Sequence, residues 1–117
     1  MDPLPDIGDL TWLFEAEPEG DRWQEDWPYS TVVFATERSG RTVSVVIDPA
    51  YEDVRVVIGA GSDIEVDVSL HEVQAVTIDR LHGVETLVVS FRPHVRAGPL
   101  RLDLEPRLSL RASVGTL

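Results

Sequence analysis

The sequence predicts an all-β fold: an antiparallel two-sheet sandwich or flattened barrel of eight or nine strands. The clearest observation is in residues 100–114, where every even-numbered residue except Pro106 is apolar and every odd-numbered residue is polar or charged. Residues 64–70 repeat this alternation, and turn residues separate the apolar segments at intervals of about 8–12 residues. Because successive side chains of a strand point to opposite faces, a period of two predicts extended chain with one buried face.

The N-terminal part is expected to add an arm and one strand. Residues 1–9 are rich in Pro and Asp, which predicts an irregular acidic arm. A first strand is predicted over residues 10–16, because Leu10, Trp12 and Phe14 alternate with polar positions.

Residues 17–28 are expected to form an acidic connection that carries two tryptophans. A short helical turn over residues 21–27 is the one helix expected, because an aspartate stands at its start and Pro28 must end it. With 117 residues, the chain is expected to form a single all-β domain. In this domain, residues 1–28 supply the arm and the first strand, and residues 29–117 supply the main sheet.

Six further strands are predicted before the last amphipathic segment. They are rich in Val, Ile and Thr, and the short segments between them contain Gly, Pro or Asp. The predicted strands span residues 31–37, 41–48, 54–58, 64–70, 73–79 and 84–92. The loop before the second of them contains Gly40, which is expected to adopt a left-handed conformation.

Pro106 interrupts the alternation of the last segment without changing its parity. Proline has no N–H to donate to a neighbouring strand, so a tight hairpin at this position is one interpretation. We favour a single bent strand over residues 100–114, with Pro106 at a sheet edge or a bulge. In either case the even-numbered face, which includes Leu102 and Leu104, is expected to lie in the core.

The composition is strongly acidic, with a formal net charge of −11. Residues 1–27 hold nine acidic residues and one arginine, whereas residues 92–117 hold five arginines and two acidic residues. An acidic surface repels phosphate groups, so no binding to nucleic acid is expected. The same charge favours a basic protein partner and speeds its encounter with the chain. The alternative is that the acidic charge only keeps the protein soluble.

A cytoplasmic location without membrane association is expected. The sequence has no cysteine, which excludes disulfides and thiolate metal sites. Its first residues lack the basic and apolar regions of a secretory signal. No apolar segment approaches the ~20 residues of a membrane-spanning helix.

No catalytic residue, cofactor or metal ion is predicted. The Gly-Ala-Gly of residues 59–61 lacks the third glycine of a dinucleotide-binding loop and precedes a predicted strand rather than a helix. The three histidines share no metal-binding spacing. No serine lies in a G-x-S-x-G motif.

The most distinctive candidate surface combines aromatic and acidic residues, because all three tryptophans lie in the first 27 residues. Tryptophan and tyrosine are typical interface anchors, and carboxylates pair with the arginines or lysines of a partner. The alternatives are that the rings only cover a sheet face, or that a sugar stacks on them. This surface includes Trp12, and its candidate partner-binding residues are Trp23, Glu25, Asp26, Trp27 and Tyr29.

A second acidic row is predicted on one face of a single strand, with neighbouring side chains ~7 Å apart. Its residues are Asp63, Glu65 and Asp67. The row could bind a row of arginines on a partner, or pair within the chain with Arg55, Arg101 or Arg111. Calcium sites normally wrap a loop around the ion, so a flat row is not typical of one.

These observations predict a small acidic, non-enzymatic binding module that captures or neutralises a basic protein partner, as inhibitors and toxin-immunity proteins do. One alternative is a structural subunit that forms a homodimer through an exposed edge strand. Another is a β-barrel that binds a small ligand or acts as an enzyme, which requires an interior pocket.

Overall fold

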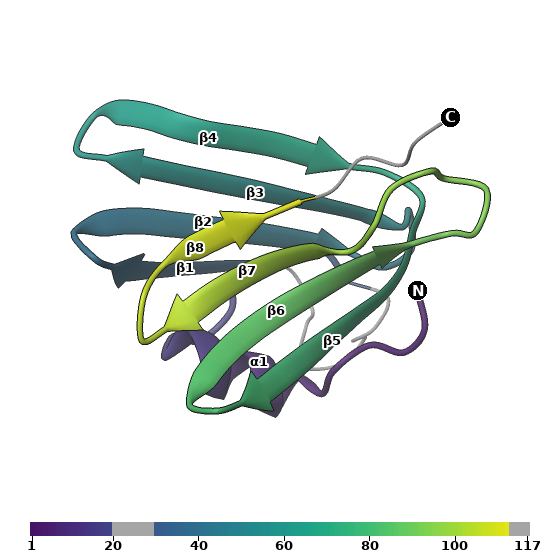
Figure 1. Cartoon of the computed structure of the whole chain (residues 1–117), viewed down its shortest axis with the longest axis horizontal. Helices are drawn as coiled ribbons and strands as arrows, with labels where there is room; N and C mark the ends of the chain where they lie inside the picture. The colour runs from purple at the N-terminus through teal and green to yellow at the C-terminus, as the bar shows by residue number, and fades with distance from the viewer. Residues whose placement is uncertain (20–29, 113–117) are drawn as a thin grey trace.

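The computed structural model describes residues 1–19 and 30–112, and it contains two antiparallel sheets of four strands each (Figure 1). The strands of sheet A lie side by side in chain order: β1 (Val32–Arg38), β2 (Arg41–Asp48), β3 (Asp53–Ala60) and β4 (Asp63–Leu70). Sheet B is arranged in the same way: β5 (Val73–Leu81), β6 (Val84–Phe91), β7 (Leu100–Glu105) and β8 (Ser109–Arg111). The predicted all-β, two-sheet fold is therefore confirmed.

The side chains that face inward from both sheets form one hydrophobic core. On β2 and β3 they occupy every second position: Val43, Val45, Ile47, Val54, Val56 and Ile58. Sheet B contributes Val73, Leu87, Val89, Leu100, Leu102 and Leu104. Full burial of one Val or Leu side chain contributes about 1.5–3 kcal/mol, so this core holds the two layers together.

The predicted strands between residues 31 and 92 are confirmed, with ends that differ by at most two residues from β1 to β6. The prediction for Gly40 is also confirmed. Ser39 and Gly40 have φ values of 54° and 74°, so both central residues of the β1–β2 turn are left-handed. This is the geometry of a type I′ hairpin, whose twist matches that of the flanking strands.

The prediction of a first strand over residues 10–16 is wrong. The chain instead forms helix α1 (Ile7–Phe14), which covers most of this segment. Leu10, Leu13 and Phe14 are fully buried, and their spacing of three and four places them on one face of a helix. The strand prediction used only the alternation of Leu10, Trp12 and Phe14. It did not account for Leu13, which is apolar and fits the helical spacing. The helical turn predicted over residues 21–27 lies outside the described residues.

The single bent strand predicted over residues 100–114 is also wrong. The segment folds back as the β7–β8 hairpin, in which Leu102 lies opposite Leu110. Partners in this hairpin have the same parity, so even-numbered residues face inward on both sides of Pro106. The alternation is therefore identical for a bent strand and for this hairpin. Burial of the even-numbered face is confirmed for Leu102 and Leu104, which are 0% and 1% exposed.

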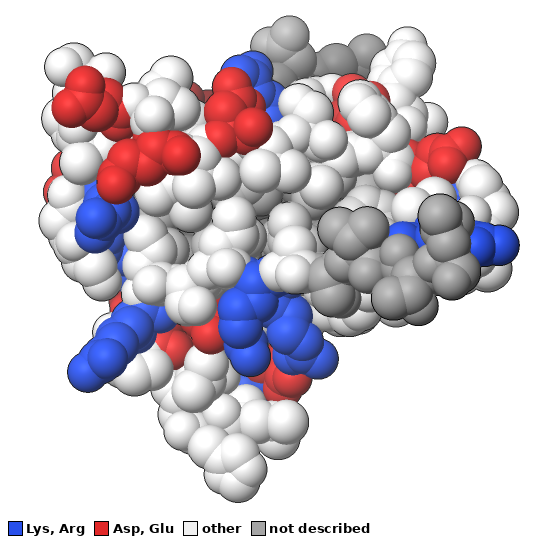
Figure 2. Space-filling view, turned by 45° about the horizontal axis from the view of Figure 1, so that its top comes forward, with Lys and Arg blue, Asp and Glu red and all other residues white. Residues whose placement is uncertain are grey.

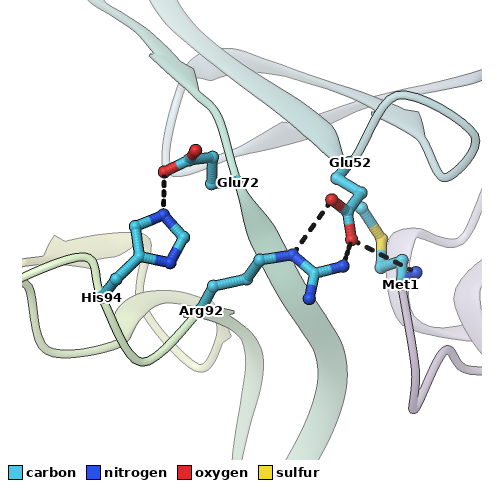
Figure 3. A network of polar contacts seen from close by, with 5 residues as sticks. All are labelled: Met1, Glu52, Glu72, Arg92 and His94. Atoms are coloured by element: carbon cyan, nitrogen blue, oxygen red, sulfur yellow. Dashed lines mark hydrogen bonds and ion pairs between the residues drawn. The ribbon is translucent and has the colours of Figure 1, made fainter.

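A polar network ties the two sheets together at one end of the sandwich (Figure 3). Arg92, which follows β6, donates two hydrogen bonds to the Glu52 carboxylate in the β2–β3 turn. The Met1 ammonium group lies 3.9 Å from the same carboxylate. His94 Nε2 lies 2.7 Å from Glu72 Oε2, which comes from the β4–β5 connection. The hydrogen bonds from Arg92 hold the pKa of Glu52 below its usual value, so this carboxylate stays ionised.

Candidate functional site

The structure tests only part of the predicted partner-binding surface. Five of its residues lie outside the described ranges, and their role remains a prediction: Trp23, Glu25, Asp26, Trp27 and Tyr29. The other three are described, and all are exposed on β4: Asp63, Glu65 and Asp67. The prediction that they share one face is wrong, because a register shift next to Gly59 places Asp63 opposite Ala60, whereas Asp67 lies opposite Val57 on the other face of the sheet. The strand lies at the edge of sheet A, next to β3.

Arginines of sheet A pair with two of the three β4 carboxylates. Arg41 Nε donates to Glu65 Oε1 over 2.6 Å. Arg55 makes two hydrogen bonds to Asp67, of 2.9 and 2.7 Å. These bonds lower the pKa of the Asp67 carboxyl and raise the pKa of the Arg55 guanidinium. Asp63 makes no ion pair within the described part of the chain.

The pairing considered with Arg101 and Arg111 does not occur, because both arginines lie in sheet B. Arg101 instead pairs with Asp79, and Arg111 with Asp103, each over 3.3 Å. Among the described residues, the cationic partners of the β4 acids are therefore Arg41 and Arg55.

A pocket of about 440 Å³ lies at the C-terminal end of α1. We call it the Trp12 pocket; its lining residues are Thr11, Trp12, Glu15, Ala16, Glu17 and Glu85. Helix α1 buries its opposite face in the core, which leaves the Trp12 side chain 62% exposed. Glu85 comes from β6, so the pocket joins residues that are about 70 positions apart in the chain.

Two arginines only partly neutralise the carboxylates at this end of the molecule. The guanidinium carbon of Arg80 lies 4.7 Å from the Trp12 ring centroid, and Arg80 Nε donates to Glu85 over 3.3 Å. Arg38 lies between Glu15 and Glu105, at 3.8 and 3.3 Å from their carboxylates.

Glu17 makes no ion pair with any described residue. The Trp12 pocket therefore has a carboxylate that no described arginine neutralises.

The Trp12 pocket contains the groups that bind a cation, in addition to the guanidinium of Arg80. The face of an indole ring attracts a guanidinium or ammonium group, and a carboxylate accepts strong hydrogen bonds from either. Arg80 shows this geometry inside the molecule, because it contacts both Trp12 and Glu85. A lysine or arginine of a partner would find the same two kinds of group together with Glu17.

Sequence reasoning identified Trp12 as part of an aromatic and acidic surface, but it missed Glu15, Glu17 and Glu85 as its neighbours. The signal available in the sequence was the helical spacing of Leu10, Leu13 and Phe14. That spacing would have placed Trp12 on the solvent side of a helix. No sequence signal connects Glu85 with this helix.

The described residues hold no group of three His, Cys, Asp or Glu side chains arranged to bind a metal ion. Of the three histidines, His71 contacts Asp53 at 2.9 Å and His94 contacts Glu72, as separate pairs. No helix within residues 1–19 and 30–112 is long and apolar enough to cross a membrane.

Over residues 1–19 and 30–112, the fold is a two-layer antiparallel β-sandwich with one short helix and an acidic, aromatic pocket. One solved chain has a similar fold, from a contact-dependent growth inhibition toxin–immunity protein complex of Klebsiella pneumoniae 342. The TM-score is 0.79, the sequence identity is 12%, and the match covers 94% of each chain. At this identity the similarity shows the fold alone. No protein-family model and no curated protein matches the chain in sequence.

Proposed function

We propose that this chain is a small acidic, non-enzymatic binding module that captures and neutralises a basic protein partner, as an immunity protein does with its toxin. The Trp12 pocket is the observation that carries the proposal. It combines an exposed tryptophan with three glutamates, one of which has no described cationic partner. The fold similarity to a chain of a toxin–immunity complex supports the same class of function.

In this proposal a lysine or arginine of the partner enters the Trp12 pocket and lies against the indole ring. Glu17 accepts its hydrogen bonds, and Glu85 exchanges Arg80 for the incoming cation. Interfaces concentrate their binding energy in a few tryptophan, tyrosine and arginine residues surrounded by weaker contacts. The pocket offers one such anchor and the charge that complements it.

The net charge of −11 extends this preference over the whole molecule. The electrostatic field of a protein with one predominant charge raises the rate at which it encounters an oppositely charged protein. Salt screens this field and lowers the rate. We further propose that Trp23, Glu25, Asp26, Trp27 and Tyr29 extend the binding surface, since they follow Glu19 in the chain. The setting we propose is the cytoplasm, with no nucleic acid and no membrane as partner.

The proposal is tested by affinity capture from cells of the organism that produces the chain, followed by mass spectrometry. The baits are the unmodified chain, Trp12→Ala, Glu85→Gln and the control Tyr51→Ala. Tyr51 is an exposed aromatic residue in the β2–β3 turn, at 76% exposure, and lies outside the Trp12 pocket.

We expect one basic protein to be enriched on the unmodified and Tyr51→Ala baits and to be depleted on the two pocket variants. Its activity when produced alone in a test strain should inhibit growth, and co-production of the chain should restore growth. Equal recovery on all four baits, or no enriched basic protein, would contradict the proposal.

A further inference from the structure

Arg80 shows which kind of cation the groups around the Trp12 pocket hold. Its guanidinium carbon lies 4.7 Å from the centroid of the Trp12 ring, and its Nε donates to Glu85 Oε1 over 3.3 Å. Arg80 and Glu85 lie opposite each other on β5 and β6, and both Trp12 and Glu85 line the pocket. The Arg80 guanidinium is therefore an internal ligand of these two groups.

Arg80 is held less firmly than other arginines of the molecule. On the face shown in Figure 2, arginine side chains lie next to acidic ones. Arg55 and Arg92 each donate two hydrogen bonds to one carboxylate. The described contact between Arg80 and Glu85 is a single hydrogen bond, and the Arg80 side chain is 41% exposed. Exposed ion pairs contribute little to stability, so a cation from outside can replace Arg80 without unfolding the chain.

A guanidinium group fits these surroundings better than an ammonium group. Its N–H donors all lie in one plane, so it places a face without donors on the indole ring and still donates to carboxylates beside the ring. An ammonium group distributes its three donors around one nitrogen and is more strongly hydrated, so contact with a ring removes water from a donor. The ring and carboxylates together therefore favour arginine over lysine.

Carboxylates reach the Trp12 pocket from two parts of the fold. Glu85 belongs to β6, whereas Glu15 and Glu17 lie at and after the end of α1. Glu15 lies 3.8 Å from Arg38, and Glu17 makes no ion pair with a described residue. A guanidinium group has five N–H donors, which suffice for Glu85 and Glu17 together.

We infer that the Trp12 pocket selects a guanidinium group, so that the partner's anchor is an arginine rather than a lysine and takes the place of Arg80. The inference rests on the proposed function, because it names the chemical group that enters the same pocket. The partner's arginine lies against Trp12 and donates to Glu85 and Glu17, while the Arg80 side chain moves into solvent.

The test removes the internal ligand and needs no identified partner. Arg80→Ala keeps the Trp12 ring and the Glu85 carboxylate but lacks the guanidinium that contacts them. Methylguanidinium and methylammonium are titrated separately, at equal ionic strength, into this variant and into the unmodified chain. Binding is followed by the NMR signal of the Trp12 indole N–H. Its absence in Trp12→Phe distinguishes this signal from those of the other two tryptophans.

Two double variants test the role of the carboxylate. Each combines Arg80→Ala with a second change, either Glu85→Gln or the matched control Glu37→Gln. Glu37 is an exposed acid of β1 that does not line the pocket. Circular dichroism verifies that all variants fold.

We expect Arg80→Ala to bind methylguanidinium at least about fivefold more tightly than methylammonium. The unmodified chain should bind methylguanidinium at least about threefold more weakly than Arg80→Ala, because Arg80 occupies the site. Adding Glu85→Gln should weaken binding by about fivefold or more, whereas adding Glu37→Gln should leave it unchanged.

Equal affinity for the two cations would overturn the inference. So would the absence of methylguanidinium binding to Arg80→Ala, or an equal loss of affinity with Glu37→Gln and Glu85→Gln. If the two cations bind equally but a basic protein is captured through the Trp12 pocket, only the preference for arginine is removed. If methylguanidinium binds as expected but no basic protein is captured, only the proposed function is removed.

Discussion

The two ends of the sandwich use charged residues in opposite ways. At the end shown in Figure 3, Glu52 is fully engaged with Arg92 and the Met1 ammonium group, and these contacts link the N-terminus, a turn of sheet A and the loop after β6. At the other end, the Trp12 pocket holds three glutamates, and Glu17 has no described cationic partner. The comparison teaches that paired charges at one end hold the layers together. At the other end, one carboxylate has no cationic partner among the described residues, and we propose that it binds a partner's cation.

Helix α1 carries the proposed binding end, so the largest effect is expected from removing its attachment to the core. Leu13→Ala deletes a fully buried side chain, and we expect a loss of about 2–5 kcal/mol in the free energy of unfolding. Urea denaturation measures this loss. Leu81→Ala is the control, because Leu81 is 62% exposed and its truncation should change stability by less than about 0.5 kcal/mol. Equal effects of the two variants would show that α1 is not part of the core.

The paired end is expected to depend on pH. Arg92 lowers the pKa of Glu52 in the folded state, so the ion pair stabilises the fold above the unfolded pKa of the carboxyl. This contribution is lost as the pH falls through the folded pKa. Glu52→Gln should therefore lower the urea midpoint at neutral pH, and the difference from the unmodified chain should vanish in acid.

The control for this experiment is Glu37→Gln, because Glu37 is exposed and forms no ion pair with a described residue. It should show no pH-dependent difference. A difference between Glu52→Gln and the unmodified chain that persists at low pH would contradict the role assigned to Arg92.

The smallest effect is expected from Arg80, which occupies part of the proposed binding end itself. Arg80 contacts both the Trp12 ring and Glu85, where the partner's cation is proposed to lie. Arg80→Ala should therefore strengthen partner binding by a few-fold, since an exposed cation–π contact contributes only about 0.5–1 kcal/mol. Titration calorimetry measures the change. Weaker binding would show that Arg80 supports the site rather than competing for it.

The sequence predicted most strands well because they bury one face, and this burial produces the alternation. Strand β6 is an exception, since its four consecutive residues 86–89 are all buried. The prediction failed at α1, where Leu10, Trp12 and Phe14 fit a period of two while Leu13 follows a helical period. It failed at Pro106 because a hairpin of equal parity and a bent strand bury the same residues.

The candidate site was less predictable, since its residues are brought together only by the fold. Glu85 reaches the Trp12 pocket through the packing of β6 near the end of α1, and no local pattern encodes that contact. The position of β4 at the edge of sheet A depends on strand order, which alternation does not determine. The acids of β4 were predicted to form one row, but the register shift next to Gly59 breaks the alternation of the strand. The pairing of Glu65 with Arg41 depends on the arrangement of sheet A.

We propose that the end with the Trp12 pocket binds the partner and that the end with Glu52 and Arg92 only stabilises the fold. Titration calorimetry of the captured basic protein against three variants tests this most directly. Trp12→Ala should weaken binding by about 30-fold or more, which corresponds to about 2 kcal/mol. Glu52→Gln and Tyr51→Ala should bind like the unmodified chain under conditions in which all variants are folded. Unchanged affinity of Trp12→Ala, or a comparable loss with Glu52→Gln, would contradict the account.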